Sequence, residues 1–418
     1  MTNATFAFVC DVLCLVLSLV FFWSTFVVLV GLIKPARRHP KSARKLKFAA
    51  LVCARNEERV IKLPVKSVLM SKYPAEAREV IVLADNCSDR TASVAREAGA
   101  TVWEKTTPSH GKGDVLEWGV QRLRAERPEV EAIAVFDADN FCSDGWFDAM
   151  NDALCDGEKV VTGRRSSSNP RATTISGWYT VYWSMINELS NRVRTNLGLS
   201  AKLTGTGFAF DISILEEHGW RTHTLVEDTE FTVQTNLRGG RVTYVPEAEY
   251  ADEQPVSADQ MWRQLRRWST GGWQVVHCYF FPWLRALARH PSLRLFDSFF
   301  AILTGMSVAF ILLFNVLAFG VRICFHNVNH STWSFFFGVF GFIFVMGWFT
   351  AFSSVALSSD KRRPGWQAML TFPIFSIILS ASVLYTRLFP TKVWKPILHS
   401  GEENIGGKPG DKWIDMAK

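Results

Sequence analysis

The chain has 418 residues, of which 48% are hydrophobic, with 32 Phe and 16 Trp. This length accommodates one domain of more than about 200 residues together with several membrane spans, and the composition argues against a wholly soluble protein. The net charge of +7 lies largely beside apolar segments, where lipid headgroups explain it, so we expect no nucleic-acid binding. The eight Cys form no CxxC pair, which argues against a disulfide framework or a zinc site.

The first apolar segment, residues 6–33, carries one charge, Asp11, and exceeds the roughly 20 residues that a spanning helix needs. A secretory signal peptide would have a shorter apolar core after a basic start. Basic residues instead follow the segment, at Lys34, Arg37, Arg38, Lys41, Arg44, Lys45 and Lys47. The positive-inside rule therefore predicts a transmembrane helix within residues 1–33, with the N-terminus outside and the next domain in the cytosol.

Residues 34–262 have ordinary globular composition and predict strands that alternate with helices. The runs FAALVCAR, EVIVLAD, ATVWEK and AIAVFD are typical of buried strands, and we expect helices between them, one over residues 115–125. This pattern indicates an α/β domain with a mostly parallel sheet, which binds ligands at the carboxyl ends of its strands. Because the polar loops NEE, DNCSD and DADN all follow such strands, we expect them to form one pocket.

Two carboxylates of the third loop, Asp137 and Asp139, could both reach a hard cation and a diphosphate. Mg²⁺ or Mn²⁺ suits such ligands and would neutralise a leaving diphosphate. Asp85 ends an earlier strand and could accept hydrogen bonds from a base or ribose. Lys112 lies between Gly111 and Gly113, where it could meet a phosphate, although a solvated turn lysine is equally compatible with this pattern.

The run LTGTGFAF places Gly205 and Gly207 on either side of Thr206. These glycines allow a ligand or a neighbouring backbone to approach closely, or form an ordinary turn. Further on, Glu227 and Asp228 precede a helical stretch, a common position for acids. A sugar hydroxyl needs a carboxylate to accept its proton, and Asp228 is the candidate general base.

Residues 263–295 predict an amphipathic segment in which Gln264, Arg267 and Trp268 share helical spacing, and an interfacial helix explains its Arg and Trp. Residues 296–390 contain three further apolar runs, 296–325, 333–357 and 366–389, and residues 391–418 form a polar tail. Four spans would leave this tail outside, yet the basic residues Arg387, Lys392 and Lys395 favour the cytosol. We expect one run to be interfacial or re-entrant, and Pro373 points to the last run, since proline disturbs a regular helix.

The ordered set ARNEE, ADNCSDRT, HGKGD, FDADN, GTGFAF, VEDTEF and QLRRW resembles the membrane-integrated branch of glycosyltransferase family 2. This branch includes cellulose, hyaluronan, chitin-oligosaccharide and poly-N-acetylglucosamine synthases, and the resemblance extends over nearly the whole chain. It implies a GT-A fold, inversion at the anomeric carbon and a nucleotide-diphosphate sugar donor, usually a uridine one.

The resemblance also implies roles for individual residues. The nucleotide pocket would include Ala54, Asn56 and Glu57, with Asp85 at the base. Asp137 would lie near the diphosphate, with Asp139 as metal ligand, and Asp228 would be the base beside Glu227. Gln264, Arg267 and Trp268 would hold diphosphate and acceptor, with Gly205, Thr206 and Gly207 in the acceptor region.

Two departures from the family pattern concern the product. Val226 stands where the family usually has Thr, and no gating-loop motif of the cellulose type follows the last span. One leading and three trailing spans are similar to the chitin-oligosaccharide type. We expect a transferase that extends a β-linked saccharide from UDP-glucose or UDP-N-acetylglucosamine. The alternative is a single addition to a lipid or lipid-linked acceptor; an inactive scaffold is disfavoured because all the acids are present. The sequence assigns no oligomeric state.

Overall fold

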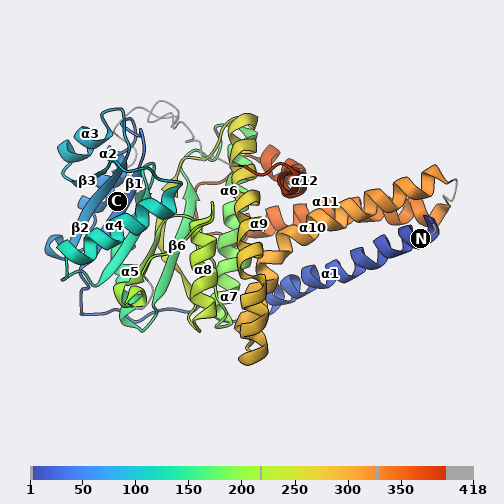
Figure 1. The fold of residues 1–418 in the computed structure, drawn as a ribbon, viewed down its shortest axis with the longest axis horizontal. Coiled ribbons are helices and arrows are strands. Elements are labelled where there is room, and N and C mark those ends of the chain that lie inside the picture. Colours follow the sequence, from blue (N-terminus) through green and yellow to red (C-terminus); the bar gives the residue numbers. More distant parts are fainter. Residues whose placement is uncertain (1–2, 217–218, 326–328, 392–418) are drawn as a thin grey trace.

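The computed structural model describes residues 3–216, 219–325 and 329–391. It has a sheet domain, a layer of helices along one side of that domain, and a group of long helices that extend away from it (Figure 1).

The sheet has the strand order β3-β2-β1-β4-β7-β6-β8-β5. β1, β2, β3 and β4 are parallel to one another, as predicted, whereas β7 runs antiparallel to both β4 and β6. β6 and β8 are parallel, and β5 is antiparallel to β8. The parallel half of the sheet therefore matches the βα alternation, and the other half is mixed. The strands are β1 (Phe48–Ala54), β2 (Arg78–Asp85), β3 (Thr101–Lys105), β4 (Ala132–Asp137), β5 (Phe141–Cys142), β6 (Val160–Ser167), β7 (Phe208–Asp211) and β8 (Val242–Asp252).

Helices cover both faces of the sheet, which is why its central strands are apolar throughout. Along β1, Phe48 and Val52 belong to one buried cluster and Leu51 to the cluster on the opposite face. Helix α4 begins at Lys112, three residues before the predicted start. The shorter helical elements are α2 (Lys62–Leu69), η1 (Ala75–Ala77), α3 (Thr91–Glu97), α4 (Lys112–Glu126), α5 (Trp146–Cys155), α6 (Thr174–Met185), the π-helix η2 (Ile186–Arg192), α7 (Val193–Asn196), η3 (Ile212–Leu215) and α8 (Glu227–Leu237).

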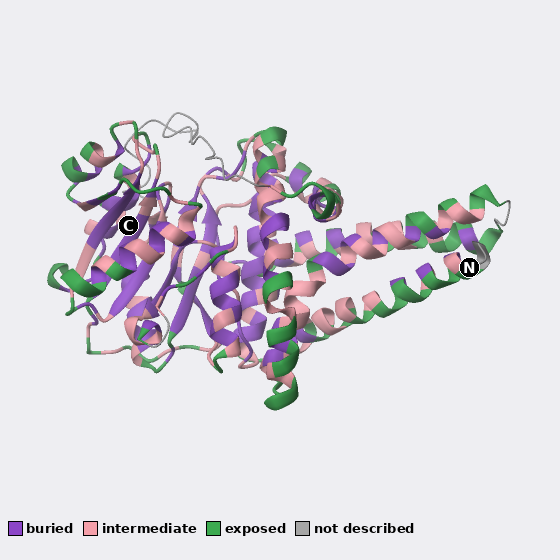
Figure 2. Cartoon of the chain, in the orientation of Figure 1, coloured by how far each residue is buried: buried purple, intermediate pink, exposed green. Residues whose placement is uncertain are grey.

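Four described helices are long and apolar enough to cross a membrane: α1 (Asn3–Ile33), α10 (Leu293–Cys324), α11 (His330–Leu357) and α12 (Trp366–Leu388). In Figure 2 the long helices that leave the sheet domain carry mainly exposed and half-buried residues. Helix α9 (Ala258–Arg289) lies between the sheet domain and these helices (Figure 1). Because α9 begins at Ala258, the predicted boundary between residues 262 and 263 falls inside a helix. The predicted tail beyond residue 391 lies outside the described residues.

Helix α12 differs in direction from the other three. Figure 1 shows it end-on, crossing the line along which α1, α10 and α11 extend. At its start, Trp178 Nε1 of α6 donates to Thr371 Oγ1 (2.9 Å), and Arg362 in the preceding loop pairs with Glu249 of β8. Near its end, Trp273 Nε1 of α9 donates to the Val383 carbonyl (2.9 Å). Both ends of α12 are therefore held on the side of the sheet domain.

Buried charges join the long helices to the sheet domain. Asp297 of α10 is fully buried, and it accepts from Arg194 Nε of α7 (2.9 Å) and from Trp23 Nε1 of α1 (3.1 Å). At the far end of the same helices, Arg322 of α10 pairs with Asp11. Removal of one partner from a buried pair is costly, so the contacts of Asp297 in particular fix how α1, α7 and α10 lie against one another.

Candidate active site

The carboxyl ends of β1, β2 and β4 open onto one cavity of about 590 Å³. Its walls also include the start of α8 and the first turns of α9. The prediction that the three polar loops meet at one edge of the sheet is confirmed. The predicted site residues in its lining are Ala54, Glu57, Asp85, Lys112, Asp137, Asp139, Gly205, Glu227, Asp228, Gln264, Arg267 and Trp268.

Asp85 lies at the end of β2 and is only 5% exposed. Ser109 Oγ donates to both of its oxygens (2.8 and 2.6 Å), and Asn86 Nδ2 donates to one of them (2.8 Å). Arg55 Nη1 lies 3.6 Å from the carboxylate. Asp85 is thus a fixed, charged acceptor at the rim of the pocket.

We expected Asn56 in the lining of the nucleotide pocket, but it does not line the cavity. Its φ of 59° is in the left-handed region, which Asn tolerates better than most residues. Its Oδ1 accepts from the Ser88 backbone N–H (2.8 Å) and so joins the loop after β1 to the loop after β2. Asn56 therefore holds these two loops together without lining the pocket.

Lys112 is the first residue of α4 and is a pocket cation, not a solvated turn lysine. Its ammonium pairs with Asp137, donates to the Gly205 carbonyl (2.6 Å) and lies 3.9 Å from Glu227. Burial alone would lower the pKa of Lys112, but Asp137 and Glu227 outweigh burial and raise it. Lys112 is therefore charged at neutral pH. The next residue, Gly113, packs closely against Thr222, since a Cβ on Gly113 would lie 2.6 Å from Thr222 Oγ1.

Asp137 and Asp139 come directly after β4. The Asp137 backbone N–H donates to Asn140 Oδ1 (2.9 Å) and Thr206 Oγ1 (3.0 Å), which fixes the turn. Asp139 accepts from the Glu253 backbone N–H (3.2 Å) and from Asn140 Nδ2 (3.2 Å). Both carboxylates line the cavity.

The donor set fits Mg²⁺ or Mn²⁺ only in combination with a substrate. Among the described residues, no group of three or more His, Cys, Asp or Glu could hold a metal ion. Mg²⁺ is commonly held by one or two carboxylates, with substrate phosphates and water completing its shell. Two carboxylates beside an ammonium group that already pairs with one of them make a place for a cation with a diphosphate.

The three residues of the glycine motif have separate roles. Gly205 (φ 88°) lines the cavity, and a Cβ there would lie 3.8 Å from Asp228 Oδ2. Thr206 is fully buried and bonds to Asn140, and a Cβ on Gly207 would meet the Tyr250 ring at 2.0 Å. Neither Thr206 nor Gly207 lines the cavity. Of the predicted acceptor region, only Gly205 can touch an acceptor.

Glu227 and Asp228 lie at the start of α8, and both line the cavity. Burial raises the pKa of Glu227 to about 7, with the neighbouring Asp228 acting in the same direction. Burial also raises the pKa of Asp228, and Lys112, Lys202 and Arg267 oppose this. A carboxylate with a raised pKa holds a proton more readily, which suits proton transfer near neutral pH.

Helix α9 brings its three predicted residues to the cavity from the membrane side. Trp268 stacks on Tyr182 (5.9 Å between centroids) and meets Tyr179 and Trp183 edge-on. These three aromatic residues come from α6, and Tyr182 and Trp183 line the cavity as well. Together they form an aromatic wall, a surface on which the apolar face of a sugar ring packs well.

Arg165 and Asp252 are cavity residues that sequence reasoning missed. Arg165 of β6 pairs with Asp252 of β8, donates to the Thr204 carbonyl (2.6 Å) and lies over the Trp183 ring (3.7 Å). The two residues lie 87 positions apart. No local motif marks them, because the pairing of β6 with β8 alone brings them together.

The fold and this arrangement are those of a glycosyltransferase with a GT-A-like fold. A family profile described as "Glycosyltransferase like family 2" matches residues 45–271, which is more than half of the chain, and the protein belongs to this family. Among curated relatives, the probable glycosyltransferase YdaM of Bacillus subtilis (strain 168) is 27% identical over 73% of this chain and 71% of its own length.

Two other similarities bear on the fold and the family. Poly-beta-1,6-N-acetyl-D-glucosamine synthase of Staphylococcus aureus (strain COL) is 24% identical over 60% of this chain, an alignment that spans 61% of the synthase. A solved structure of the mannosyltransferase PcManGT from Pyrobaculum calidifontis, in complex with GDP-Man and Mn²⁺, superposes with a TM-score of 0.61. It is 14% identical and covers 92% of this chain and all of that structure. The similarity extends beyond the sheet domain, so the long helices belong to the shared fold.

Proposed function

We propose that the protein transfers a sugar, with inversion, from a uridine-diphosphate donor to an acceptor hydroxyl. The observation that carries this proposal is the single cavity that joins Asp137 and Asp139 to Asp228 and to Trp268 of α9. Carboxylates for a metal–diphosphate pair lie at one end of it, and Asp228, a half-buried candidate base, lies at the start of α8.

In the proposed reaction, Asp85 accepts hydrogen bonds from the nucleoside, and Lys112 and Arg267 face the negative diphosphate. Mg²⁺ or Mn²⁺, when held by Asp139 and Asp137, would add charge stabilisation for the leaving group. Asp228 accepts the proton of the acceptor hydroxyl, whose oxygen bonds to the anomeric carbon. The bond from that carbon to the diphosphate breaks on the opposite face, and UDP leaves with the electron pair.

The donor sugar is proposed to be N-acetylglucosamine or glucose. Support comes from the poly-N-acetylglucosamine synthase relative and from the motif set. A growing β-linked saccharide is the acceptor that this relative suggests. A single addition to a lipid is the second candidate, and one observation favours it: the cavity continues among α10 and α12.

The placement of α12 suggests how the chain lies in the membrane. We propose that α1, α10 and α11 span it, with the sheet domain in the cytosol, and that α12 lies in the plane of the membrane surface. This arrangement removes the conflict between four spans and a basic C-terminal flank, because three spans return the chain to the cytosol after α11.

Thiol labelling tests this topology. In a variant without other Cys, the exposed Cys324 at the end of α10 should react with a membrane-impermeant maleimide from outside. Single cysteines introduced as Ser359→Cys and Phe389→Cys, before and after α12, should both be protected in intact cells and react once the membrane is opened. Labelling of Phe389→Cys from outside would show that α12 crosses the membrane.

Release of nucleotide from a donor panel tests the activity. Purified protein with UDP-N-acetylglucosamine, UDP-glucose or GDP-mannose should release nucleoside diphosphate from a uridine donor in Mn²⁺ or Mg²⁺. EDTA should stop the release. If no donor yields metal-dependent release in membranes or detergent, the proposed function is wrong.

A further inference from the structure

The cavity has two chemically different ends. At the strand edge it is lined by charged groups, whereas α10 and α12 contribute only apolar residues: Ile302, Gly305, Met306, Leu379 and Val383. On α9 between these ends, Ser269 contributes a hydroxyl that is already bonded to Ser382 (2.7 Å). Polar cavity residues near α12 are Arg266 of α9, whose guanidinium lies over the Tyr385 ring (5.1 Å), and Thr391. The apolar surface at this end is therefore the part formed by α10 and α12.

This apolar end distinguishes two kinds of acceptor. A saccharide chain would lose hydrogen bonds to water against this surface and leave polar groups unpaired. A hydrocarbon chain gains instead, because its apolar surface is removed from water. The lining of α10 and α12 therefore favours a hydrocarbon chain over a sugar polymer.

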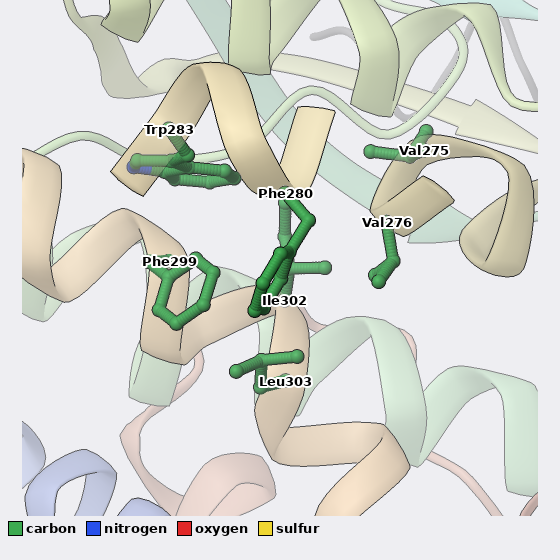
Figure 3. Close-up of a pocket in the computed structure, with 7 residues that line it drawn as sticks. All are labelled: Val275, Val276, Phe280, Trp283, Phe299, Ile302 and Leu303. Carbon is green, nitrogen blue, oxygen red and sulfur yellow. The ribbon is translucent and has the colours of Figure 1, made fainter. Parts of the chain in front are cut away.

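A second hollow, small (about 10 Å³) and lined by apolar residues, lies beside this end. It lies between α9 and α10, where Val276 and Phe280 of α9 face Phe299, Ile302 and Leu303 of α10 (Figure 3). Ile302 lines both the hollow and the cavity, so the two lie next to each other. Beside the hollow, Phe281 is 71% exposed, as expected for a side chain that meets lipid.

We infer that the acceptor is a membrane lipid whose head group carries a free hydroxyl. Its hydrocarbon chain would lie among α9, α10 and α12 beside Ile302, and its hydroxyl would meet Asp228. This inference rests on the proposed function, whose base it uses: the lipid oxygen bonds to the anomeric carbon, its proton passes to Asp228, and UDP leaves. A hydroxyl is the nucleophile that needs such a base.

Two glycines of α10 provide a matched test. A Cβ added at Gly305 or at Gly320 meets no atom within 4 Å, so Gly→Leu fits the backbone at both positions. Only Gly305 lines the cavity. Gly305→Leu should fill the apolar end, whereas Gly320→Leu adds the same side chain elsewhere on the same helix.

The assay uses membranes from the expressing bacterium, Mn²⁺, and radiolabelled UDP-N-acetylglucosamine or UDP-glucose, followed by extraction with chloroform and methanol. Label should enter the organic phase with the wild type and Gly320→Leu. Gly305→Leu should lower it at least about tenfold, which is 1.4 kcal/mol, while UDP binding is unchanged. A second pair on α12, Leu379→Trp in the cavity and Leu388→Trp (wild-type residue 75% exposed), should behave in the same way.

Three outcomes would overturn the inference while leaving the proposed function intact. One is label found only in water-soluble saccharide. Another is organic label that neither Gly305→Leu nor Leu379→Trp reduces. The third is equal loss in both members of each pair, with UDP binding retained. Failure of the wild type to release UDP from any donor is a different result, and it would reject the proposed function itself.

Discussion

The two ends of the cavity differ in how the chain builds them. The strand-edge end comes from β1, β2 and β4, which are neighbours in the sheet and lie within residues 48–137. The membrane end comes from α6, α9, α10 and α12, which reach it from positions far apart in the chain. At the strand edge the charged groups are held by local loops, and at the membrane end the shape depends on helix packing. The strand-edge end is therefore encoded largely by local sequence, whereas the membrane end is set by tertiary structure.

Helix α8 lies between the two ends and carries Asp228, the proposed base. A Cβ on Gly271 of α9 would lie 2.7 Å from Val226, just before Glu227, so the two helices touch closely there. The Leu225 backbone N–H donates to Gln274 Oε1 of α9 (2.9 Å). The start of α8, which carries Asp228, is thus positioned by contacts with α9. At the strand-edge end, Lys112 acts to lower the pKa of Asp228.

The largest expected effect is on the rate of transfer and comes from a substitution of Asp228, where the two ends of the cavity meet. Asp228→Asn keeps the size of the side chain but removes its ability to accept a proton. The transfer rate should fall by about 10²–10⁴-fold, measured as kcat for UDP release with acceptor present, and donor affinity measured by calorimetry should remain.

The matched control for this variant is Asp144→Asn, since Asp144 pairs with Lys72 outside the cavity and should keep full activity. Substantial turnover by Asp228→Asn would move the role of base to another carboxylate, and Glu227 would be the next to test.

A smaller effect tests the donor end alone. Asp139→Ala removes one of the two carboxylates proposed to hold the metal, and loss of a ligand should weaken metal-dependent donor binding by about 100-fold. Titration of UDP with and without Mn²⁺ measures this effect. Unchanged affinity in Mn²⁺ would show that Asp139 holds no metal, and binding without metal should stay the same in variant and wild type.

The comparison also explains what could be predicted from the sequence. The strands ending at Ala54, Asp85 and Asp137 were predictable, because apolar runs followed by polar loops in a βα repeat place those loops at one edge. Asp228 and Trp268 were identified only through their motifs. Family resemblance placed Asn56, Thr206 and Gly207 in the pocket, but they shape its walls from outside the lining.

Long-range pairing accounts for what was missed. Arg165 meets Asp252 only because β6 pairs with β8. The crosswise direction of α12 could be suspected from Pro373 and the basic flank, yet its contacts with α6 and α9 depend on tertiary packing. Ile302 lies in an ordinary apolar run, and nothing in that run marks its position between cavity and hollow.

The smallest expected effect is on the free energy of unfolding, and it comes from the burial of Glu227 where the two ends of the cavity meet. Burial raises the pKa of Glu227 from 4.5 to about 7. Below pH 4.5 the group is protonated in both the folded and the unfolded chain, and its contribution to stability is fully present. As the pH rises from 4.5 to 7 the unfolded chain releases this proton first, so stability is lost through that window and stays lower above it.

Glu227→Gln cannot ionise and should avoid the loss. At pH 8 we expect a gain of at most about 3 kcal/mol in the free energy of unfolding, seen as a higher Tm in detergent, and a smaller gain at pH 5. Glu76→Gln, at an exposed position, should change Tm at neither pH. A variant that is less stable than the wild type at pH 8 would mean that the ionised Glu227, through its contact with Lys112, stabilises the junction.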